Sequence, residues 1–162
     1  MRIIGIDPGL RRAGWGVIER QGSRLVHIGN GVCDSGEGPL GQRLARLHAG
    51  LAEVIARHAP QAAAIERTFV NADPAGALRL GQARGVALLA LAQAGLPVTE
   101  FAPNAIKKAV VGAGRADKAQ VAAMVAMLLP GARAEAHDAW DALAIAIARA
   151  NLAEALRPEA VT

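Results

Sequence analysis

Hydrophobic residues in the N-terminal third of the chain form three short runs of strand type. The runs cover residues 2–7, 14–19 and 24–33, and short apolar or alternating runs bounded by turn residues are typical of β-strands. Pro8 and Gly9 separate the first two runs, and this pair favours a tight turn. Because the connections are compact, the pattern predicts an antiparallel meander of three strands.

After this meander the apolar residues change to the period of a helix. They recur at helical spacing over residues 40–58, and Pro60 follows this segment, which predicts a helix. A short apolar run at residues 62–66 predicts a buried strand. Asp73 followed by Pro74 is typical of a helix start, and we expect that helix to extend to residue 94.

The C-terminal part is expected to add one strand and further helices. The strand is predicted at residues 97–101, and helices at 103–110, 117–129 and 136–156. Strands in this order imply an α/β fold with three layers, in which one mixed five-stranded sheet carries helices on both faces. We therefore expect one domain over residues 1–157 and a short tail over residues 158–162.

The expected helix at residues 74–94 is apolar around most of its circumference, whereas a surface helix usually has one apolar stripe. Gly81 and Gly85 lie one turn apart and would permit close approach of another backbone. One side of this helix can pack on the sheet, and the other needs a partner. A second copy of the chain is the favoured interpretation, because closed two-fold dimers are the commonest assembly; an intrachain cover is the alternative.

Composition excludes several classes of protein. The chain has 162 residues, of which 52% are hydrophobic and 20% are charged, as in a globular domain with a substantial core. Cys33 is the only cysteine, which excludes an intramolecular disulfide framework and a cysteine-rich zinc site. The longest apolar run, residues 86–92, is far shorter than the roughly 20 residues of a membrane helix. The N-terminus lacks a secretory signal, so we expect a cytoplasmic protein without a membrane partner.

Four acidic residues stand where the predicted elements end or begin. Asp7 ends the first strand, Glu66 ends the strand at residues 62–66, and Asp138 and Asp141 lie three apart at the start of the last helix, a spacing that puts both on one helix face. If the two strands are neighbours, these carboxylates can meet. Each acid alone has a simpler interpretation, as a turn former or as a first-turn acid that answers the helix dipole.

Four carboxylates in one crevice repel one another unless divalent cations compensate. Hard oxygen ligands of this kind suit Mg²⁺ or Mn²⁺. Two such ions, roughly 3.5–4 Å apart, are a known means of hydrolysing phosphodiesters. The acids therefore suggest a metal-dependent nuclease.

Four motifs, read together, resemble the RuvC family of Holliday-junction resolvases. They are Ile-Gly-Ile-Asp-Pro-Gly at residues 4–9, Ile-Glu-Arg-Thr-Phe at 65–69, Leu-Gly-Gln-Ala-Arg-Gly at 80–85 and Asp-Ala-Trp-Asp-Ala-Leu-Ala-Ile-Ala at 138–146. The resemblance runs in order from about residue 1 to residue 155. It implies an RNase H-like fold, a homodimer, Mg²⁺-dependent paired nicking of four-way DNA junctions, and recruitment by a branch-migration complex of the RuvA and RuvB kind.

The resemblance also assigns roles to the acids. Asp7 would bridge two Mg²⁺ ions, Glu66 would hold one of them, and Asp141 with Asp138 would hold the other, with Mn²⁺ as a possible substitute. Some relatives have histidine where Asp138 stands. The adjacent His137 is therefore a candidate ligand or base, but it lies about 100° around the helix from Asp138, and a solvated histidine at a helix start is the simpler interpretation.

A basic stretch accompanies the acids. It contains all three lysines of the chain, Lys107, Lys108 and Lys118, together with Arg115. Such residues can contact phosphates and give salt-dependent binding without reading sequence, although a solvated basic face is the alternative. The resemblance implies a role in DNA binding or catalysis for Lys107 and Lys118, and leaves Lys108 open.

Residues after the second acid are further candidates. Phe69 could stack on a base or wedge into a junction, which the resemblance supports, or it could anchor its loop to the core. Arg67 could contact phosphate or neutralise the acids. Trp15 and Trp140 are expected to pack in the interior.

Other functions fit parts of the pattern. The Gly5–Gly9 segment also resembles the phosphate loop of actin-like ATPases and sugar kinases, but 162 residues leave no room for their second domain. A catalytically silent nucleic-acid-binding or processing protein of the YqgF type is an alternative, against which the complete set of four acids argues. A nuclease for duplexes or RNA–DNA hybrids on the same scaffold is not excluded by the carboxylates.

Overall fold

The computed structural model describes residues 1–67 and 73–155. Its centre is a five-stranded sheet in the order β3-β2-β1-β4-β5. The strands are β1 (Arg2–Asp7), β2 (Arg12–Gln21), β3 (Arg24–Asp34), β4 (Ala62–Glu66) and β5 (Val98–Phe101). β1, β2 and β3 are antiparallel neighbours, whereas β4 runs parallel to β1 and to β5. The predicted meander and the mixed sheet are both confirmed.

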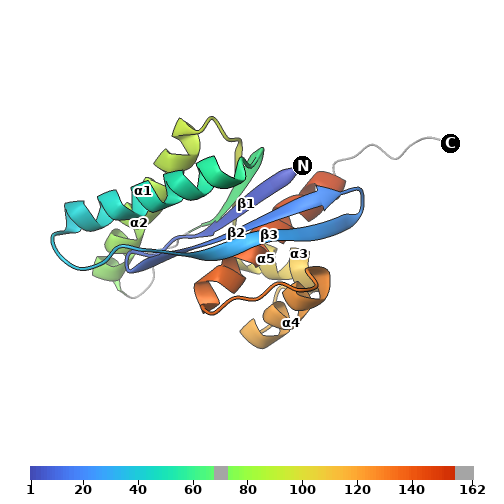
Figure 1. Ribbon diagram of the computed structural model, residues 1–162. Coiled ribbons are helices and arrows are strands. Elements are labelled where there is room, and N and C mark those ends of the chain that lie inside the picture. Colours follow the sequence, from blue (N-terminus) through green and yellow to red (C-terminus); the bar gives the residue numbers. More distant parts are fainter. Residues whose placement is uncertain (68–72, 156–162) are drawn as a thin grey trace.

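Helices cover both faces of this sheet, as Figure 1 shows. On one face lie α1 (Leu40–His58) and α2 (Pro74–Gln93), and on the other lie α3 (Pro103–Val111), α4 (Lys118–Leu128) and α5 (His137–Ala155). The predicted three-layer α/β fold is therefore confirmed. The expected tail at residues 158–162 lies outside the described residues.

The two faces of the sheet have separate hydrophobic cores, because side chains alternate between faces along a strand. In β1, Ile3 packs with α3, α4 and α5, which together we call the α5 layer, whereas Ile4 and Ile6 pack with α1 and α2. In β4, Ala62 and Ala64 face the α5 layer in the same way. By the same alternation, Asp7 at the end of β1 and Glu66 at the end of β4 also lie on the face covered by α5.

Glycines allow α5 to lie very close to β1 and β2. A Cβ built on Gly5 would stand 2.1 Å from the Ala142 carbonyl oxygen, and one built on Gly14 would stand 2.0 Å from the Asp138 carbonyl oxygen. No real side chain tolerates such distances, so any larger residue would push the helix off the sheet. The first turns of α5 are thereby fixed against the ends of these strands.

The outward side of α2 is apolar and exposed. Leu78 is 67% exposed and Leu89 is 51% exposed, and Gly81 and Gly85 lie on the same helical stripe between them. Nothing in the described part of the chain comes within 4 Å of a Cβ built on either glycine. The alternative of a cover from within the chain is therefore not supported by residues 1–67 and 73–155.

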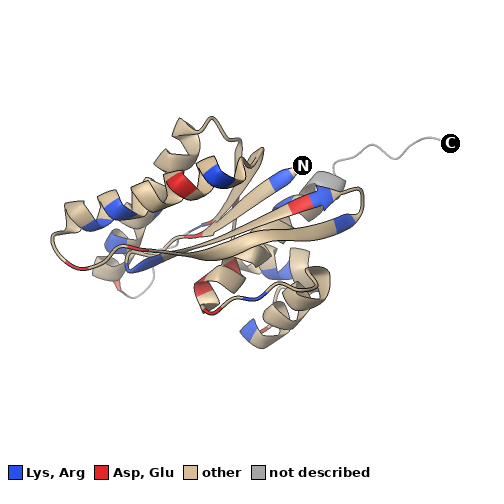
Figure 2. Ribbon diagram, viewed as in Figure 1, with Lys and Arg blue, Asp and Glu red and all other residues tan. Residues whose placement is uncertain are grey.

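Charged residues lie mostly away from these cores, and Figure 2 shows several of them spread along α1. Arg46, Glu53 and Arg57 of this helix are exposed. Arg43 is half-buried and donates to the Ser35 hydroxyl. Across residues 1–67 and 73–155, none of the helices combines the length and the apolar character needed to cross a membrane.

Candidate active site

Strand geometry brings the first two acids together. Ile6 of β1 lies opposite Ile65 of β4 in parallel register. The next residue of each strand, Asp7 and Glu66, therefore lies side by side with the other at the same edge of the sheet. Neighbouring strands are about 4.8 Å apart. Since each acid falls on the face turned to α5, both carboxyl groups enter the space between the sheet and that helix. The two strands that carry Asp7 and Glu66 are therefore neighbours, as the predicted meeting of these acids required.

The start of α5 supplies the other two acids. Asp7 lies opposite Gly14 in the β1–β2 ladder, and the absence of a side chain at Gly14 lets the Asp138 backbone pass directly over it. Asp141 follows after three residues, close to one helical turn. The close packing of α5 on the strands therefore places Asp138 and Asp141 beside Asp7.

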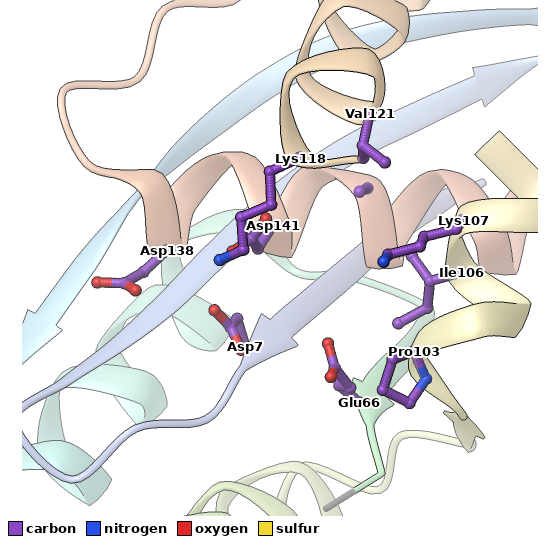
Figure 3. A pocket seen from close by; sticks show the side chains of 10 residues that line it. Asp7, Glu66, Pro103, Ile106, Lys107, Lys118, Val121, Asp138 and Asp141 are labelled. Carbon is purple, nitrogen blue, oxygen red and sulfur yellow. The ribbon is translucent and has the colours of Figure 1, made fainter. Parts of the chain in front are cut away.

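These four acids line a single pocket of about 330 Å³. Figure 3 shows Asp7, Glu66 and Asp141 directed into the same space, with the Asp138 carboxylate turned to the outside. The lining consists of Asp7, Glu66, Pro103, Ile106, Lys107, Lys118, Val121, Asp138, Asp141 and Ala144. The pocket thus combines four carboxylates, two ammonium groups and an apolar wall.

Basic side chains hold some of the carboxylate oxygens. The ammonium of Lys118 lies 3.6 Å from Asp141 Oδ2, and Arg12 Nε lies 3.8 Å from Asp138 Oδ2. Lys107 projects into the pocket from α3, on the side of Glu66 (Figure 3). Exposed pairs at such distances stabilise the fold little, so their effect is to orient the acids and partly offset their charge.

Two of the acids bind their protons more tightly than usual. The pKa of Asp7 is raised to about 7, first by burial and then by the negative charges of Asp141, Glu66 and Asp138, against the lowering effect of Lys118. The pKa of Glu66 is also raised, first by burial and then by Asp141, while Lys118 and Lys107 lower it. A carboxylate whose pKa rises because of its neighbours is one that a cation would stabilise strongly.

The donor set fits a hard divalent cation, because it consists of carboxylate oxygens around a half-buried negative centre. In residues 1–67 and 73–155, however, no three acidic, histidine or cysteine side chains already surround one point at ligand distance. Asp138 and Asp141 each have one oxygen near a basic side chain, Arg12 and Lys118 respectively.

Other predicted site residues lie elsewhere. Lys108 and Arg115 are exposed and do not line the pocket. Arg67 is also exposed, and its Nε lies 3.8 Å from Glu100 Oε2, outside the pocket lining. His137 is exposed at the start of α5 and is not part of the lining. Phe69 lies outside the described residues.

Two features of the site were not predicted. Arg12 reaches Asp138 from the start of β2, and nothing in its sequence context distinguishes it from the adjacent Arg11. The apolar wall formed by Ile106 and Val121 comes from α3 and α4, and the helical periodicity of these segments could have indicated it. The prediction that Trp140 packs in the interior is confirmed, since it is half-buried against the core of the α5 layer.

Sequence comparisons identify relatives over almost the whole chain. The family described as "Crossover junction endodeoxyribonuclease RuvC" matches residues 3–149. The RuvC protein of Ruegeria pomeroyi is 63% identical over 150 residues, which covers 93% of this chain and 91% of the relative. That of Paracoccus denitrificans is 60% identical over 151 residues, with 93% and 92% covered.

Solved structures show the same fold. A structure titled "T. thermophilus RuvC in complex with Holliday junction substrate" aligns with a TM-score of 0.89 and 35% identity, and 96% of each chain is covered. The yeast mitochondrial Holliday junction resolvase Ydc2 aligns with a TM-score of 0.63 at 15% identity, over 94% of this chain and 82% of that one; this likeness shows the fold alone. The predicted RNase H-like fold is confirmed.

The raised pKa of Asp7 predicts a pH-dependent stability in the absence of metal. A group that binds its proton more tightly when folded destabilises the fold as pH rises from its unfolded value of 3.8 through about 7. Asp7→Asn should therefore unfold with a free energy about 1–3 kcal/mol higher than the wild type at pH 8, and the difference should vanish near pH 4. Urea unfolding in EDTA at pH 4, 6 and 8 measures this.

The matched control is Glu37→Gln, at an exposed carboxylate of the loop before α1. It should change the unfolding free energy by less than about 0.5 kcal/mol at every pH. An Asp7→Asn variant that is no more stable than wild type at pH 8 would contradict the electrostatic account of the pocket.

Proposed function

This chain belongs to the RuvC family of crossover junction endodeoxyribonucleases and is a Holliday junction resolvase; we propose that Asp7, Glu66, Asp138 and Asp141 form its catalytic centre. The activity is a phosphodiester hydrolysis that belongs to DNA recombination and repair. The observation that supports the assignment of the residues is that one pocket is lined by all four acids together with Lys107 and Lys118. We propose residues 1–157 as the one nuclease domain.

RuvC enzymes are metal-dependent nucleases, and we propose two Mg²⁺ ions per site for this chain, with Mn²⁺ as a substitute. Asp7 stands between Glu66 and the acids of α5 (Figure 3), so it is the carboxylate suited to contact both ions. Glu66 would hold one ion, and Asp138 with Asp141 the other. When bound, such ions supply an activated water and stabilise the leaving oxygen of the phosphodiester.

The chain's own residues prepare the pocket for this chemistry. The half-buried position of Asp7 keeps bulk water from screening its charge. The apolar wall of Ile106 and Val121 restricts water on the side of α3 and α4. Lys107 and Lys118 place two positive charges at the pocket mouth, where they can attract the phosphate of the strand to be cut.

We propose a homodimer that joins through α2. Its exposed stripe of Leu78, Gly81, Gly85 and Leu89 has no cover in the described chain. A two-fold dimer would present two identical pockets to a four-way DNA junction, whose opposed strands are also related by a two-fold axis. We further propose a cytoplasmic location and recruitment by a branch-migration complex of the RuvA and RuvB kind.

A comparison of DNA substrates tests the function. With Mg²⁺, the wild type should nick a labelled synthetic four-way junction symmetrically and leave a linear duplex and an RNA–DNA hybrid uncut. Asp7→Asn should bind the junction as tightly as wild type and cut it at least about 1000-fold more slowly, a loss of about 4 kcal/mol. Equal cutting by this variant would refute the assignment of Asp7, and junction binding without any cutting by the wild type would favour a silent YqgF-type protein.

Two adjacent lysines allow a matched test of the basic residues. Lys107 lines the pocket, whereas Lys108 is exposed and is not part of the lining. Lys107→Ala should weaken junction binding and reduce the slope of log K against log salt by about 0.9 if it contacts one phosphate. Lys108→Ala should leave both unchanged. Binding is measured between 50 and 200 mM salt, roughly the range in which such slopes are resolved; equal effects of the two variants would indicate a general basic face.

The dimer surface can be tested by adding a charge to it. Leu78→Glu should shift sedimentation from dimer to monomer, with the dimer dissociation constant raised about 10-fold or more, because it places two carboxylates in an apolar contact. Met127→Glu is the control, since Met127 on α4 is 73% exposed and lies on the opposite layer. A Leu78→Glu variant that stays dimeric would locate the interface elsewhere.

A further inference from the structure

The motif at residues 80–85 contains an arginine that the dimer surface and the pocket lining do not explain. Gly81 and Gly85 belong to the outward stripe of α2, but Arg84 is turned inward and its side chain is only 18% exposed. It does not line the pocket. It contacts instead the backbone of Glu66, which does line the pocket.

Arg84 bridges the ends of two parallel strands. Its Nε donates to the backbone carbonyl oxygen of Glu66, the last residue of β4, at 3.2 Å. Its Nη2 donates to Glu100 Oε2 on β5 at 2.5 Å. Arg84 therefore ties α2 to the strand end from which the Glu66 side chain enters the pocket.

The carbonyl of Glu66 lies where the ladder between β4 and β1 stops. The last pair of that ladder is Ile6 with Ile65, so the carbonyl that follows takes its donor from α2 instead. On the other side, β4 remains paired, because Glu66 lies opposite Phe101 and the Arg67 amide donates to the Phe101 carbonyl at 2.7 Å. With Arg84 in place, the backbone at Glu66 is held from both sides.

Arginine is well suited to make both contacts from one side chain. The guanidinium is planar and presents donors in several fixed directions, so Nε and Nη2 can serve two acceptors at once. A lysine at this position has all three of its N–H donors on one nitrogen, so it could serve both acceptors only if that single nitrogen lay within reach of both the Glu100 carboxylate and the Glu66 carbonyl. Glu100 is further shared with Arg67, whose Nε lies 3.8 Å from the same oxygen.

We propose that Arg84 is a positioning residue that sets the metal affinity of the Glu66 carboxylate by clamping the end of β4 to α2. The inference rests on the proposed function of the four acids. Glu66 shares its pocket with like charges, which push its carboxylate outward. A fixed backbone limits that movement, as outer contacts do for metal ligands in general, where their loss weakens metal binding about 10–100-fold.

The experiment uses the full chain and two metal readouts. Binding of Mn²⁺ to the DNA-free protein is followed by electron paramagnetic resonance of the free ion, and the Mg²⁺ concentration for half-maximal junction cutting is measured separately. Arg84→Met should weaken Mn²⁺ binding about 10-fold and raise the half-maximal Mg²⁺ concentration by a similar factor. Junction binding without metal should not change, because Arg84 does not line the pocket.

Two further variants separate positioning from simple stabilisation. Arg84→Lys retains the charge opposite Glu100 and should weaken Mn²⁺ binding nearly as much as Arg84→Met. Arg57→Met is the matched control, since it breaks a different arginine–carboxylate pair, with Glu53 on α1, and should leave Mn²⁺ binding unchanged. If Arg84→Met does not fold, Arg84→Lys decides the question.

Each outcome has one meaning. Wild-type Mn²⁺ affinity in Arg84→Lys or in a folded Arg84→Met overturns the positioning role, even if melting temperatures fall. A wild type that binds Mn²⁺ but does not cut junctions refutes the proposed function, while the effect of Arg84 on the metal would still stand. A wild type that binds no Mn²⁺ overturns the metal site and this inference together.

Discussion

The close contact between α5 and the β1–β2 hairpin is the constraint on which the site depends. The helix backbone passes over Gly5 and Gly14 at distances that exclude any side chain there. Strand pairing alone brings together only Asp7 and Glu66. The acids of α5 reach them because this helix lies directly on the strands, so a change at either glycine would separate the two halves of the pocket without altering an acid.

This arrangement has an energetic cost that the rest of the fold must offset. Burial and the neighbouring acids raise the pKa of Asp7 to about 7, and burial and Asp141 raise the pKa of Glu66. The fold stabilises this centre by the two cores on either face of the sheet, which contain fully buried side chains such as Ile3, Ile4 and Leu143. Lys118 and Arg12 hold two of the acids by their outer oxygens. The same charges that destabilise the metal-free protein are those that would attract divalent cations, which is the usual conflict between stability and function at such sites.

Much of the fold could be predicted from periodicity, because strands and helices impose different spacings on buried residues. Three features could be predicted in this way: the change from strands to helices after residue 34, the strand that ends at Glu66 and the helix start at Asp73. Four distant acids could be assigned to one site because they occupy element ends, which topology brings together. Periodicity alone could not distinguish Lys107 from Lys108, because which of the two lines the pocket depends on how α3 docks; only the family resemblance favoured Lys107. The sequence also could not reveal Arg12 or the inward turn of Arg84, because both depend on side-chain direction and not on pattern.

The proposed dimer and the proposed role of Arg84 involve opposite sides of α2. Its outer stripe is apolar and open, and its inner side sends Arg84 to the carbonyl of Glu66. A helix that is held from outside by a second copy would have less freedom to move away from the sheet. Arg84 contacts the end of β4 through its planar guanidinium group. A restraint on α2 would therefore also restrain the backbone of Glu66, a proposed metal ligand. If the proposed dimer restrains α2 in this way, Glu66 would be held most firmly in the dimer, which would disfavour cutting of ordinary DNA by a single copy.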